Sequence, residues 1–321
     1  MEERLLAILR LAKRMKATDI HFHLCYNEIT IDMRIDGTFK KVKTTYGDEK
    51  LIRYLQYLAN LDVGHLLEPQ TGQFEMEIDD SILSLRFAVI NSVSYTDGVL
   101  RILNADLKID ANNLSSIKEQ NDYFKSLLEN DYGLVIFSGP TGSGKTTTLY
   151  SLLKSVKGKK IYTIEDPIEV YNDNFVQLQI NDAIGFTYEE GIKQLLRHDP
   201  DIIMIGEIRD SKAAKMAVVA ANTGHLVLTT LHSSRASSAV SRLVELGVNE
   251  AHLYEMLLSV SNQRMMIKKD NSKLVLYEIM DKKEIDYFRK HGENSENFLS
   301  LEKQINDGRN KELFKEDWNV L

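Results

Sequence analysis

The sequence predicts an α/β protein in which a parallel sheet with helices on both faces follows a small α+β domain. Two patterns indicate this organisation. From about residue 117 onward, short apolar segments alternate with helical segments, as in parallel strands joined by crossover helices. Before that point, strand-length runs alternate apolar and polar side chains. The polar, turn-prone stretch 106–116 is the predicted linker between domains 1–105 and 117–321.

The first domain is predicted to begin with an amphipathic helix at 4–16, where apolar residues recur at helical spacing. Residues 29–35 alternate apolar and polar side chains, as a half-buried strand does. Asp36-Gly37 is predicted to form a hairpin turn, because both residues can take positive φ. A second helix is predicted over 49–61. The other predicted strands of this domain are 38–42, 73–79, 82–90 and 99–103.

The second domain is predicted to hold short buried strands, each followed by a helix or by a polar loop. The predicted strands are 134–137, 161–164, 202–205 and 226–230. The predicted helices are 145–156, 188–197, 211–222 and 234–246. The charged tail after residue 268 is predicted to be helical. In a parallel sheet of this kind, groups at the carboxyl ends of the strands reach the ligand crevice.

Composition places the chain among ordinary globular proteins. Of its 321 residues, 43% are hydrophobic and 27% are charged, which excludes wholesale disorder and collagen-like architectures. No apolar run approaches the ~20 residues of a spanning helix, so we expect any membrane association to go through a partner. The net charge of −7 gives no sign of nucleic-acid binding. The one cysteine, Cys25, allows no intrachain disulfide and no four-cysteine zinc site, and it fits a reducing cytosol.

A glycine-rich segment after the strand 134–137 predicts a phosphate-binding loop. Residues 139–146 satisfy the pattern G-x-x-x-x-G-K-[ST] between a strand and a helix. The glycines let successive N–H groups point at one spot, and the helix N-terminus adds its positive dipole end. Lys145 would contact the β- and γ-phosphates of ATP, and the Thr146 hydroxyl would be a Mg²⁺ ligand. The residues expected to contact the nucleotide are Gly139, Pro140, Thr141, Gly142, Ser143, Gly144, Lys145, Thr146 and Thr147.

Carboxylates follow two other predicted strands. Glu207 comes after strand 202–205, where it is placed to orient or deprotonate a water molecule. Glu165 and Asp166 follow strand 161–164, which suits the water shell of a metal or an acid–base role, although Asp-Pro also simply makes a turn. Glu165 and Glu207 are therefore expected to contact Mg²⁺ through water.

Two histidines, His225 and His232, flank the apolar run of the strand 226–230. Either could be an ordinary structural residue whose polar atoms are satisfied locally. At the ends of a strand in this sheet, they could instead sense a γ-phosphate or support the catalytic carboxylate. Zinc binding is not expected, because no further ligands lie nearby at a suitable spacing.

In this order, these segments resemble the secretion ATPase superfamily of type II secretion and type IV pilus assembly. The resemblance covers about residues 15–280, and its motifs are specific in combination. It rests on the Walker A loop (139–146), the Asp box (163–169), the Walker B segment (196–210) and the His box (224–232). The segments 17–21, 33–37, 85–87 and 99–103 resemble the domain that precedes the ATPase core in that family.

The chain also departs from the large assembly ATPases of this family. It is too short for their extra N-terminal domain, and it lacks the cysteines of their zinc subdomain. The family's Gly-Arg-Phe is Gly72-Gln73-Phe74 here, and a Pro-Thr loop is replaced by residues 94–97. A short, two-domain chain without zinc resembles the competence pilus ATPases of Gram-positive bacteria.

The resemblance implies a RecA-like ATPase core, a PAS-like first domain and a homohexameric ring. ATP would bind where the two domains of a subunit meet, and Arg86 and Arg101 would reach its phosphates from the first domain. Both arginines could alternatively be solvated side chains of a strand face. His232 and His225 would couple the state of the γ-phosphate to movement of the first domain.

The implied activity is hydrolysis of ATP to ADP and phosphate, with Mg²⁺. The ring would drive a pilus platform protein of the inner membrane and so power assembly of a competence pseudopilus, DNA uptake or protein secretion. We therefore expect a cytoplasmic protein held at the membrane through this partner. A pilus retraction motor is an alternative, and so is a nucleotide-gated scaffold with little turnover. A DNA-translocating motor is disfavoured, and direct nucleic-acid binding is not expected.

Overall fold

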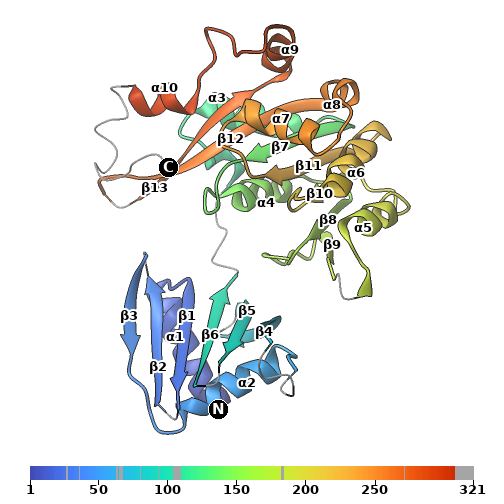
Figure 1. Cartoon of the computed structure of the whole chain (residues 1–321). Coiled ribbons are helices and arrows are strands. Elements are labelled where there is room, and N and C mark those ends of the chain that lie inside the picture. Colours follow the sequence, from blue (N-terminus) through green and yellow to red (C-terminus); the bar gives the residue numbers. More distant parts are fainter. Residues whose placement is uncertain are drawn as a thin grey trace. The chain divides into compact units, whose positions relative to one another are not determined.

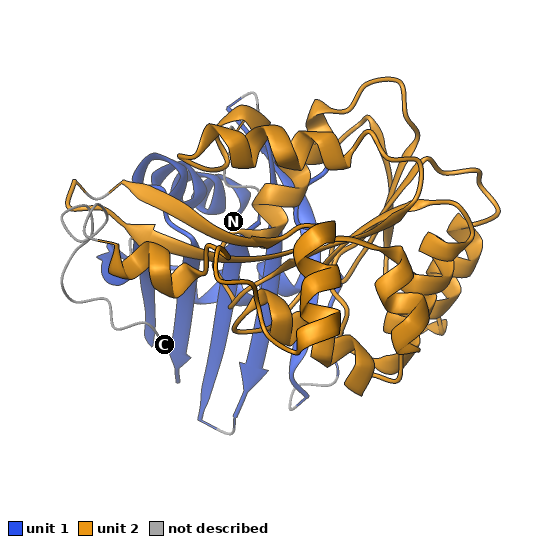
Figure 2. Cartoon of the chain, turned by 90° about the horizontal axis from the view of Figure 1, so that it is seen from above, with its two compact units in different colours: residues 1–106, 169–171 blue, residues 107–168, 172–321 orange. Residues whose placement is uncertain are grey.

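A computed structural model of the chain describes residues 1–26, 28–35, 37–62, 64, 68–79, 81–92, 94–103, 110–181, 184–270 and 272–307. The chain divides into two compact units, residues 1–106 with 169–171 and residues 107–168 with 172–321 (Figure 2). Each unit has its own sheet and its own hydrophobic core. Residues 104–109, which include part of the predicted linker, lie outside the described residues, and a 3-10 turn η2 (Ala111–Asn113) follows them.

Unit 1 is an antiparallel sheet with the strand order β3-β2-β1-β6-β5-β4 (Figure 1). Its strands are β1 (Asp19–Cys25), β2 (Glu28–Ile35), β3 (Thr38–Val42), β4 (Gln70–Ile78), β5 (Ser81–Asn91) and β6 (Tyr95–Ile102). Its helices are α1 (Glu2–Met15) and α2 (Leu51–Leu58), the second preceded by the 3-10 turn η1 (Asp48–Lys50). The predicted hairpin joins β2 to β3, where Ile35 pairs with Thr38; Asp36 of its turn lies outside the described residues.

The core of unit 1 lies between its helices and one face of the sheet. Leu9 of α1 and Leu55 of α2 are fully buried in it. Phe22 of β1 and Phe87 of β5 meet edge to face there, with ring centroids 6.5 Å apart. Because side chains alternate along a strand, the neighbours of these residues point to the opposite face of the sheet, and that face carries the charged residues of β1, β5 and β6.

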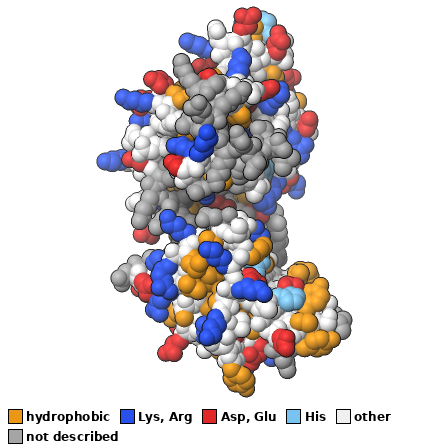
Figure 3. Space-filling view, turned by 90° about the vertical axis from the view of Figure 1, so that its left-hand side faces the viewer, with side chains coloured by type: hydrophobic (Ala, Val, Ile, Leu, Met, Phe, Trp, Pro, Cys, Tyr) orange, Lys and Arg blue, Asp and Glu red, His pale blue; other side chains and the backbone are white. Residues whose placement is uncertain are grey.

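The strand β3 forms one edge of this sheet and is exposed along most of its length. Lys40 and Lys41 are exposed on it. Figure 3 views unit 1 from this side and shows Lys and Arg side chains gathered there. Charged side chains on an edge strand oppose its pairing with the edge of another chain, which explains how unit 1 tolerates an open edge.

Unit 2 is built on a sheet of order β13-β12-β7-β11-β10-β8-β9. Neighbouring strands run parallel, except that β13 is antiparallel to β12. The strands are β7 (Gly133–Ser138), β8 (Ile161–Glu165), β9 (Phe175–Gln179), β10 (Ile202–Ile205), β11 (Leu226–Leu231), β12 (Leu257–Ile267) and β13 (Lys273–Met280). The helices are α3 (Lys118–Leu127), α4 (Lys145–Ser155), α5 (Tyr188–Leu195), α6 (Ser211–Asn222), α7 (Ala236–Glu245), α8 (Glu250–Met256), α9 (Lys282–His291) and α10 (Leu301–Asn306).

Helices cover both faces of the unit 2 sheet (Figure 1). The helices α5, α6, α7 and α8 share one continuous core with alternate residues of the strands. On the other face, Phe124 of α3 packs against Phe137 of β7 and Tyr277 of β13, with ring centroids 5.4 and 5.0 Å apart. The predicted parallel sheet with helices on both faces, preceded by a small α+β unit, is therefore confirmed. No described helix has the length and apolar character needed to cross a bilayer.

The tail after residue 268 is not wholly helical, so that prediction is wrong in part. Lys273–Met280 forms β13, and the helices α9 and α10 follow it. Polar residues interrupt the apolar pattern of this strand, and their hydrogen-bond partners are distant in the sequence. Glu278, for example, is buried and accepts hydrogen bonds from the backbone N–H groups of Ala236 and Leu301. The strands β1, β9 and β12 were also not predicted.

Asp48 is a buried carboxylate that ties α1 to the start of α2. It accepts hydrogen bonds from Nε and Nη2 of Arg4, at 2.9 and 2.8 Å, and from the backbone N–H and hydroxyl of Thr45, at 2.8 and 2.9 Å. Burial by itself would raise the pKa of Asp48. The hydrogen bonds from Arg4 and Thr45 outweigh burial and hold this pKa below its ordinary value.

We expect the unfolding free energy of Asp48→Asn to fall less at acid pH than that of the wild type. A carboxylate whose pKa is lowered by folding stabilises the folded chain above its unfolded pKa of about 4, and that contribution is lost as pH falls through the folded pKa. Urea titrations at pH 7 and below pH 4 should show a larger fall in unfolding free energy for the wild type than for Asp48→Asn. Arg4→Met should lower stability mainly at pH 7. Parallel pH profiles for wild type and Asp48→Asn would contradict this expectation.

Candidate functional site

The loop predicted to bind phosphate connects β7 to α4 and curls through three glycines. Their φ angles are +142° at Gly139, +80° at Gly142 and +89° at Gly144, a region that side chains disfavour. A Cβ on Gly139 would lie 2.5 Å from the carbonyl oxygen of Gln263 and 2.8 Å from Oγ of Ser143, so no larger residue fits there. A glycine curl that leads into a helix N-terminus is the backbone form that binds phosphate.

Lys145 begins α4 and is buried against this loop. Its ammonium donates hydrogen bonds to the carbonyl oxygens of Gly139, at 2.9 Å, and Pro140, at 3.0 Å. Thr146 and Thr147 follow in the first turn of α4 and are half-buried. The arrangement therefore fits a phosphate group, with one fixed positive charge and a hydroxyl where a Mg²⁺ ion would need a ligand. In the described parts of the chain, no three His, Cys, Asp or Glu side chains gather as a metal site.

Parallel pairing brings three further strand ends to the edge of the sheet where this loop begins. Leu231 of β11 pairs with Ser138 of β7, so His232 follows beside the first residue of the loop. On the other side of β11, Ile205 of β10 pairs with Thr229, and Glu207 therefore lies beside the end of β11. The end of β8 comes next to β10 in the same direction.

Glu207 is held by one group on each carboxylate oxygen. Its Oε1 lies 3.1 Å from Nε2 of His232, and its Oε2 accepts a hydrogen bond from Nε of Arg209 at 2.9 Å. The side chain of Glu207 remains 22% exposed. Since a carboxylate has about four lone-pair sites, each oxygen can still accept a hydrogen bond from water.

Arg209 joins two of the predicted carboxylates. Besides Glu207, it donates from Nη1 to Oδ2 of Asp166, at 2.9 Å. Burial by itself would lower the pKa of Arg209, but the adjacent Glu207 and Asp166 carboxylates raise it, so the guanidinium stays charged. Burial, aided by the Asp166 carboxylate, also raises the pKa of the nearby Tyr188 hydroxyl, which stays protonated. Asp166, Arg209, Glu207 and His232 thus form one chain of contacts from the end of β8 to the end of β11.

Glu165 ends β8 and is almost fully buried. Its Oε1 accepts hydrogen bonds from the hydroxyls of Tyr150 and Thr163, both at 2.7 Å, and from Nε2 of Gln177 at 3.5 Å. Tyr150 comes from α4, the helix that begins at Lys145, and Gln177 comes from β9. Donors from α4, β8 and β9 therefore hold this carboxylate.

The structure does not bring His225 to this group of residues. His225 precedes β11, whereas His232 follows it, and a six-residue strand separates its ends by about 20 Å. Nδ1 of His225 lies 3.2 Å from the carbonyl oxygen of Ala220 and 3.2 Å from Oγ1 of Thr223. These local contacts match the structural alternative for this histidine.

Arg86 and Arg101 lie side by side on the face of the unit 1 sheet opposite its core, as directly paired residues of β5 and β6. Nε of Arg101 donates to Oδ1 of Asp19 at 2.8 Å. Burial by itself would raise the pKa of Asp19, but hydrogen bonds from Arg101 and Thr18 lower it. The next residue in the row, Gln73, pairs with Arg86, so the departure from the family's Gly-Arg-Phe falls beside a predicted site arginine.

Sequence reasoning missed several residues that hold this site together. Arg209 lies two residues after Glu207, and a basic residue so close to a predicted catalytic carboxylate was an available signal. Tyr150 and Gln177 carried no signal, because nothing local shows that they reach Glu165. Asn262 and Gln263, which contact the phosphate loop from β12, were also missed.

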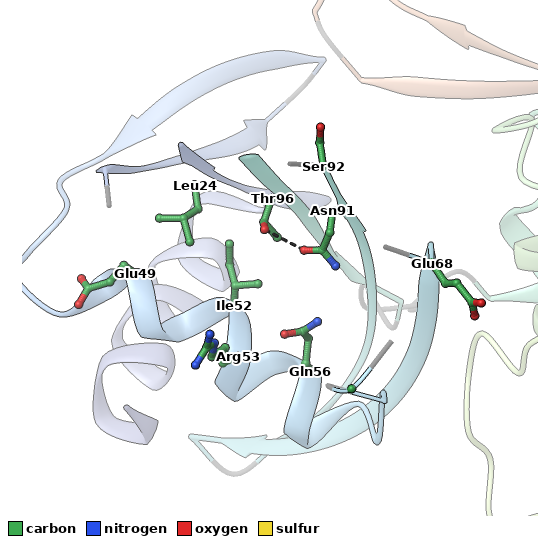
Figure 4. Close-up of a pocket in the computed structure, with 10 residues that line it drawn as sticks. Leu24, Glu49, Ile52, Arg53, Gln56, Glu68, Asn91, Ser92 and Thr96 are labelled. Carbon is green, nitrogen blue, oxygen red and sulfur yellow. Dashed lines mark hydrogen bonds between the residues drawn. The ribbon is translucent and has the colours of Figure 1, made fainter. Parts of the chain in front are cut away.

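A separate hollow of about 680 Å³ lies in unit 1, between α2 and the ends of β1, β5 and β6 (Figure 4). Gln56 and Ile52 of α2 point into it, opposite Leu24 and Asn91 (Figure 4). None of the predicted site residues is among its described lining residues. The hollow is therefore distinct from the phosphate loop.

Comparison with known proteins finds relatives that match most of the chain. The family model described as "Type II/IV secretion system protein" matches residues 1–308. The competence protein ComGA of Bacillus subtilis is 36% identical over 256 residues, which are 78% of this chain and 72% of that protein. The putative type II secretion system protein E of Escherichia coli is 35% identical over 267 residues, 81% of this chain, and the chain spans only 54% of its length.

Among solved structures, the pilus retraction motor PilT with bound ADP is similar in fold, with a TM-score of 0.72 and 28% sequence identity. The match covers 88% of this chain and 86% of PilT. The matches of sequence and of fold both extend over most of the chain. The chain therefore belongs to the type II/IV secretion system protein family, whose relatives include secretion and pilus ATPases.

Proposed function

We propose that this chain hydrolyses ATP to ADP and phosphate and, as a homohexameric motor, powers assembly of a competence pseudopilus, in DNA uptake or protein secretion. One observation carries the proposal. A glycine curl with a buried lysine stands at the same sheet edge as a carboxylate that His232 and Arg209 orient. Similarity to ComGA supports the competence assignment, and the ADP bound to PilT supports nucleotide binding.

In this proposal, the loop amides and Lys145 bind the β- and γ-phosphates of ATP. A Mg²⁺ ion, when bound with the nucleotide, would neutralise phosphate charge, with Thr146 as its protein ligand. Glu207 orients the attacking water and accepts its proton, while Arg209 and His232 keep the carboxylate in place. Glu165 would hold a water molecule near the metal, from the position that Tyr150 and Thr163 give it.

The proposal gives Arg86 and Arg101 the role of stabilising charge on the transferred phosphoryl group. Arginines placed in this way are worth about 10³–10⁵ in rate in other phosphoryl-transfer enzymes. Support comes from their adjacent positions on one sheet face. Asp19 holds the Arg101 guanidinium on that face.

Coupling to movement is assigned to His232. Its contact with Glu207 places it where it can respond to loss of the γ-phosphate. The proposed partner is a pilus platform protein of the inner membrane, which would hold the motor at the cytoplasmic side. An ATPase assay on size-fractionated protein, with and without the cytosolic part of such a platform protein, tests turnover, assembly and coupling together. Turnover confined to the monomer fraction, or unaffected by the partner, would contradict the motor.

A pilus retraction motor is a second candidate, favoured by the similarity to PilT over most of both chains. The two candidates share the same site and differ in the direction of force. Deletion of the gene separates them. Loss of surface pili indicates assembly, whereas excess pili indicate retraction.

Glu207→Gln should lower kcat for ATP by about 10²–10⁴-fold, because the amide cannot accept the proton from water. Lys145→Ala should instead abolish nucleotide binding. Glu245→Gln, which changes an exposed carboxylate of α7 paired with Arg242, is the matched control and should keep wild-type turnover. Steady-state phosphate release and binding of a fluorescent ADP analogue measure the two effects. Undiminished turnover in Glu207→Gln would remove Glu207 from the mechanism, and negligible wild-type turnover would favour the scaffold alternative.

Arg209→Met should lower kcat by about tenfold or more with little change in KM, because it removes the charged hydrogen bonds to Glu207 and Asp166, of which the first orients Glu207. Arg209→Lys should restore only part of the activity, since an ammonium cannot hold two carboxylates in the planar geometry of a guanidinium. Arg242→Met, which breaks an exposed ion pair with Glu245, is the control. A rise in KM at constant kcat would show that Arg209 acts on binding instead.

A further inference from the structure

The strand β12 carries a buried polar stretch directly behind the phosphate loop. It pairs in parallel with β7, where Asn262 lies beside Ser138, the last residue before the loop. The next residues of β12 continue past the end of β7 and along the loop. Asn262 and Gln263 are both fully buried there. Two adjacent buried amides in the middle of a sheet require a physical reason, because burying a polar group is costly unless it is hydrogen-bonded.

Asn262 connects the start of the loop to the segment that carries His232. Its Nδ2 donates to Oγ of Ser138 at 2.9 Å and to the carbonyl oxygen of Ser233 at 3.0 Å. Ser233 directly follows His232 in the chain. Oγ of Ser138 in turn donates to the carbonyl oxygen of Ser261 on β12, at 3.1 Å. One amide therefore fixes the distance between the loop and the residue that contacts Glu207.

Gln263 supports the far side of the loop. Its Nε2 donates to the carbonyl oxygen of Ser143 at 2.8 Å. Its backbone carbonyl oxygen lies only 2.5 Å from where a Cβ on Gly139 would be, so β12 packs directly against the curl. Gln263 thus touches the loop near both of its ends, at the first glycine and at the residue before Gly144.

The side-chain oxygens of these amides help to explain why the two residues are buried here. Among the described residues, neither Oδ1 of Asn262 nor Oε1 of Gln263 has a hydrogen-bond donor, although both atoms are buried. A buried oxygen without a hydrogen bond destabilises the fold. An apolar side chain of similar shape would fill the same space without that cost, so packing alone does not account for the two amides. The hydrogen bonds that their N–H groups donate do account for the two amides.

We propose that Asn262 and Gln263 are positioning residues of the ATPase site. Gln263 holds the phosphate loop in its binding conformation, and Asn262 holds the His232 segment at a fixed place beside that loop. The inference rests on the proposed nucleotide hydrolysis. The sequence motifs do not assign these two roles. Gln263 acts on nucleotide affinity, and Asn262 acts on turnover through His232.

The test uses two shape-preserving variants and two matched controls in the full-length chain. Gln263→Met and Asn262→Leu remove the amides. Gln304→Met and Asn121→Leu remove buried amides of the same kind elsewhere in unit 2: Gln304 donates to the carbonyl oxygen of Tyr277, and Asn121 to those of Asn112 and Ser115. Circular dichroism and the thermal midpoint report folding. A fluorescent ADP analogue reports affinity without turnover.

We expect Gln263→Met to weaken binding of the ADP analogue about tenfold, whereas Gln304→Met leaves it unchanged at a similar thermal midpoint. Asn262→Leu should lower kcat about tenfold with a smaller change in affinity, whereas Asn121→Leu should not. The double variant of Asn262→Leu with His232→Ala should lose no more kcat than the larger single loss, because both changes disturb one unit. Gln263→Met combined with His232→Ala should show independent effects.

Three results would overturn the inference: equal binding by Gln263→Met and its control, equal turnover of Asn262→Leu and its control, or multiplicative losses of kcat in the Asn262–His232 pair. Where Asn262→Leu does not fold, Ser138→Ala removes the same link more mildly and is read against the same criteria. Binding of the ADP analogue without turnover in the wild type would refute the proposed hydrolysis. The comparison of Gln263→Met with Gln304→Met would then decide the inference. No binding in the wild type would refute both.

Discussion

The parallel register of β7, β11 and β10 is the constraint on which the candidate site depends. A slip of one residue would move His232 by about 3.3 Å along the sheet and turn neighbouring side chains to the opposite face. Contacts beyond the end of β10 oppose such a slip. Oγ1 of Thr230 donates to the carbonyl oxygen of Gly206 at 2.6 Å, and the N–H of Ile208 donates to the carbonyl oxygen of Thr230 at 3.0 Å. The backbone on both sides of Glu207 is therefore fixed to β11.

The sequence predicts those parts of the site whose signal is local. The phosphate loop needs glycine at positions of positive φ, and Lys145 has a fixed spacing from them, so a short pattern identifies both. Glu207 is predictable because it closely follows an apolar strand in a chain with parallel topology. The predicted strands follow from the same periodicity, and two of the missed strands, β12 and β13, are interrupted by buried polar residues.

The remainder of the site could not be predicted because its contacts join distant parts of the chain. Asn262 reaches Ser138 across more than a hundred residues of sequence, and Gln263 reaches Ser143 over a similar separation. Nothing in the run from 259 to 263 shows that these polar side chains are buried. Arg209 differs, because its neighbour Glu207 was already assigned. Only the position of Asp166 on the adjacent strand end gives Arg209 its second partner.

The two carboxylates of the site differ in their exposure to solvent, and this difference separates their roles. Glu165 is buried, and its Oε1 accepts hydrogen bonds from Tyr150 of α4 and from Thr163 of its own strand. Glu207 keeps contact with solvent and has Arg209 and His232 on different oxygens. A base that takes a proton from water needs access to that water and a partner that offsets its change of charge. Glu207 has both, whereas the burial of Glu165 suits a group whose position stays fixed.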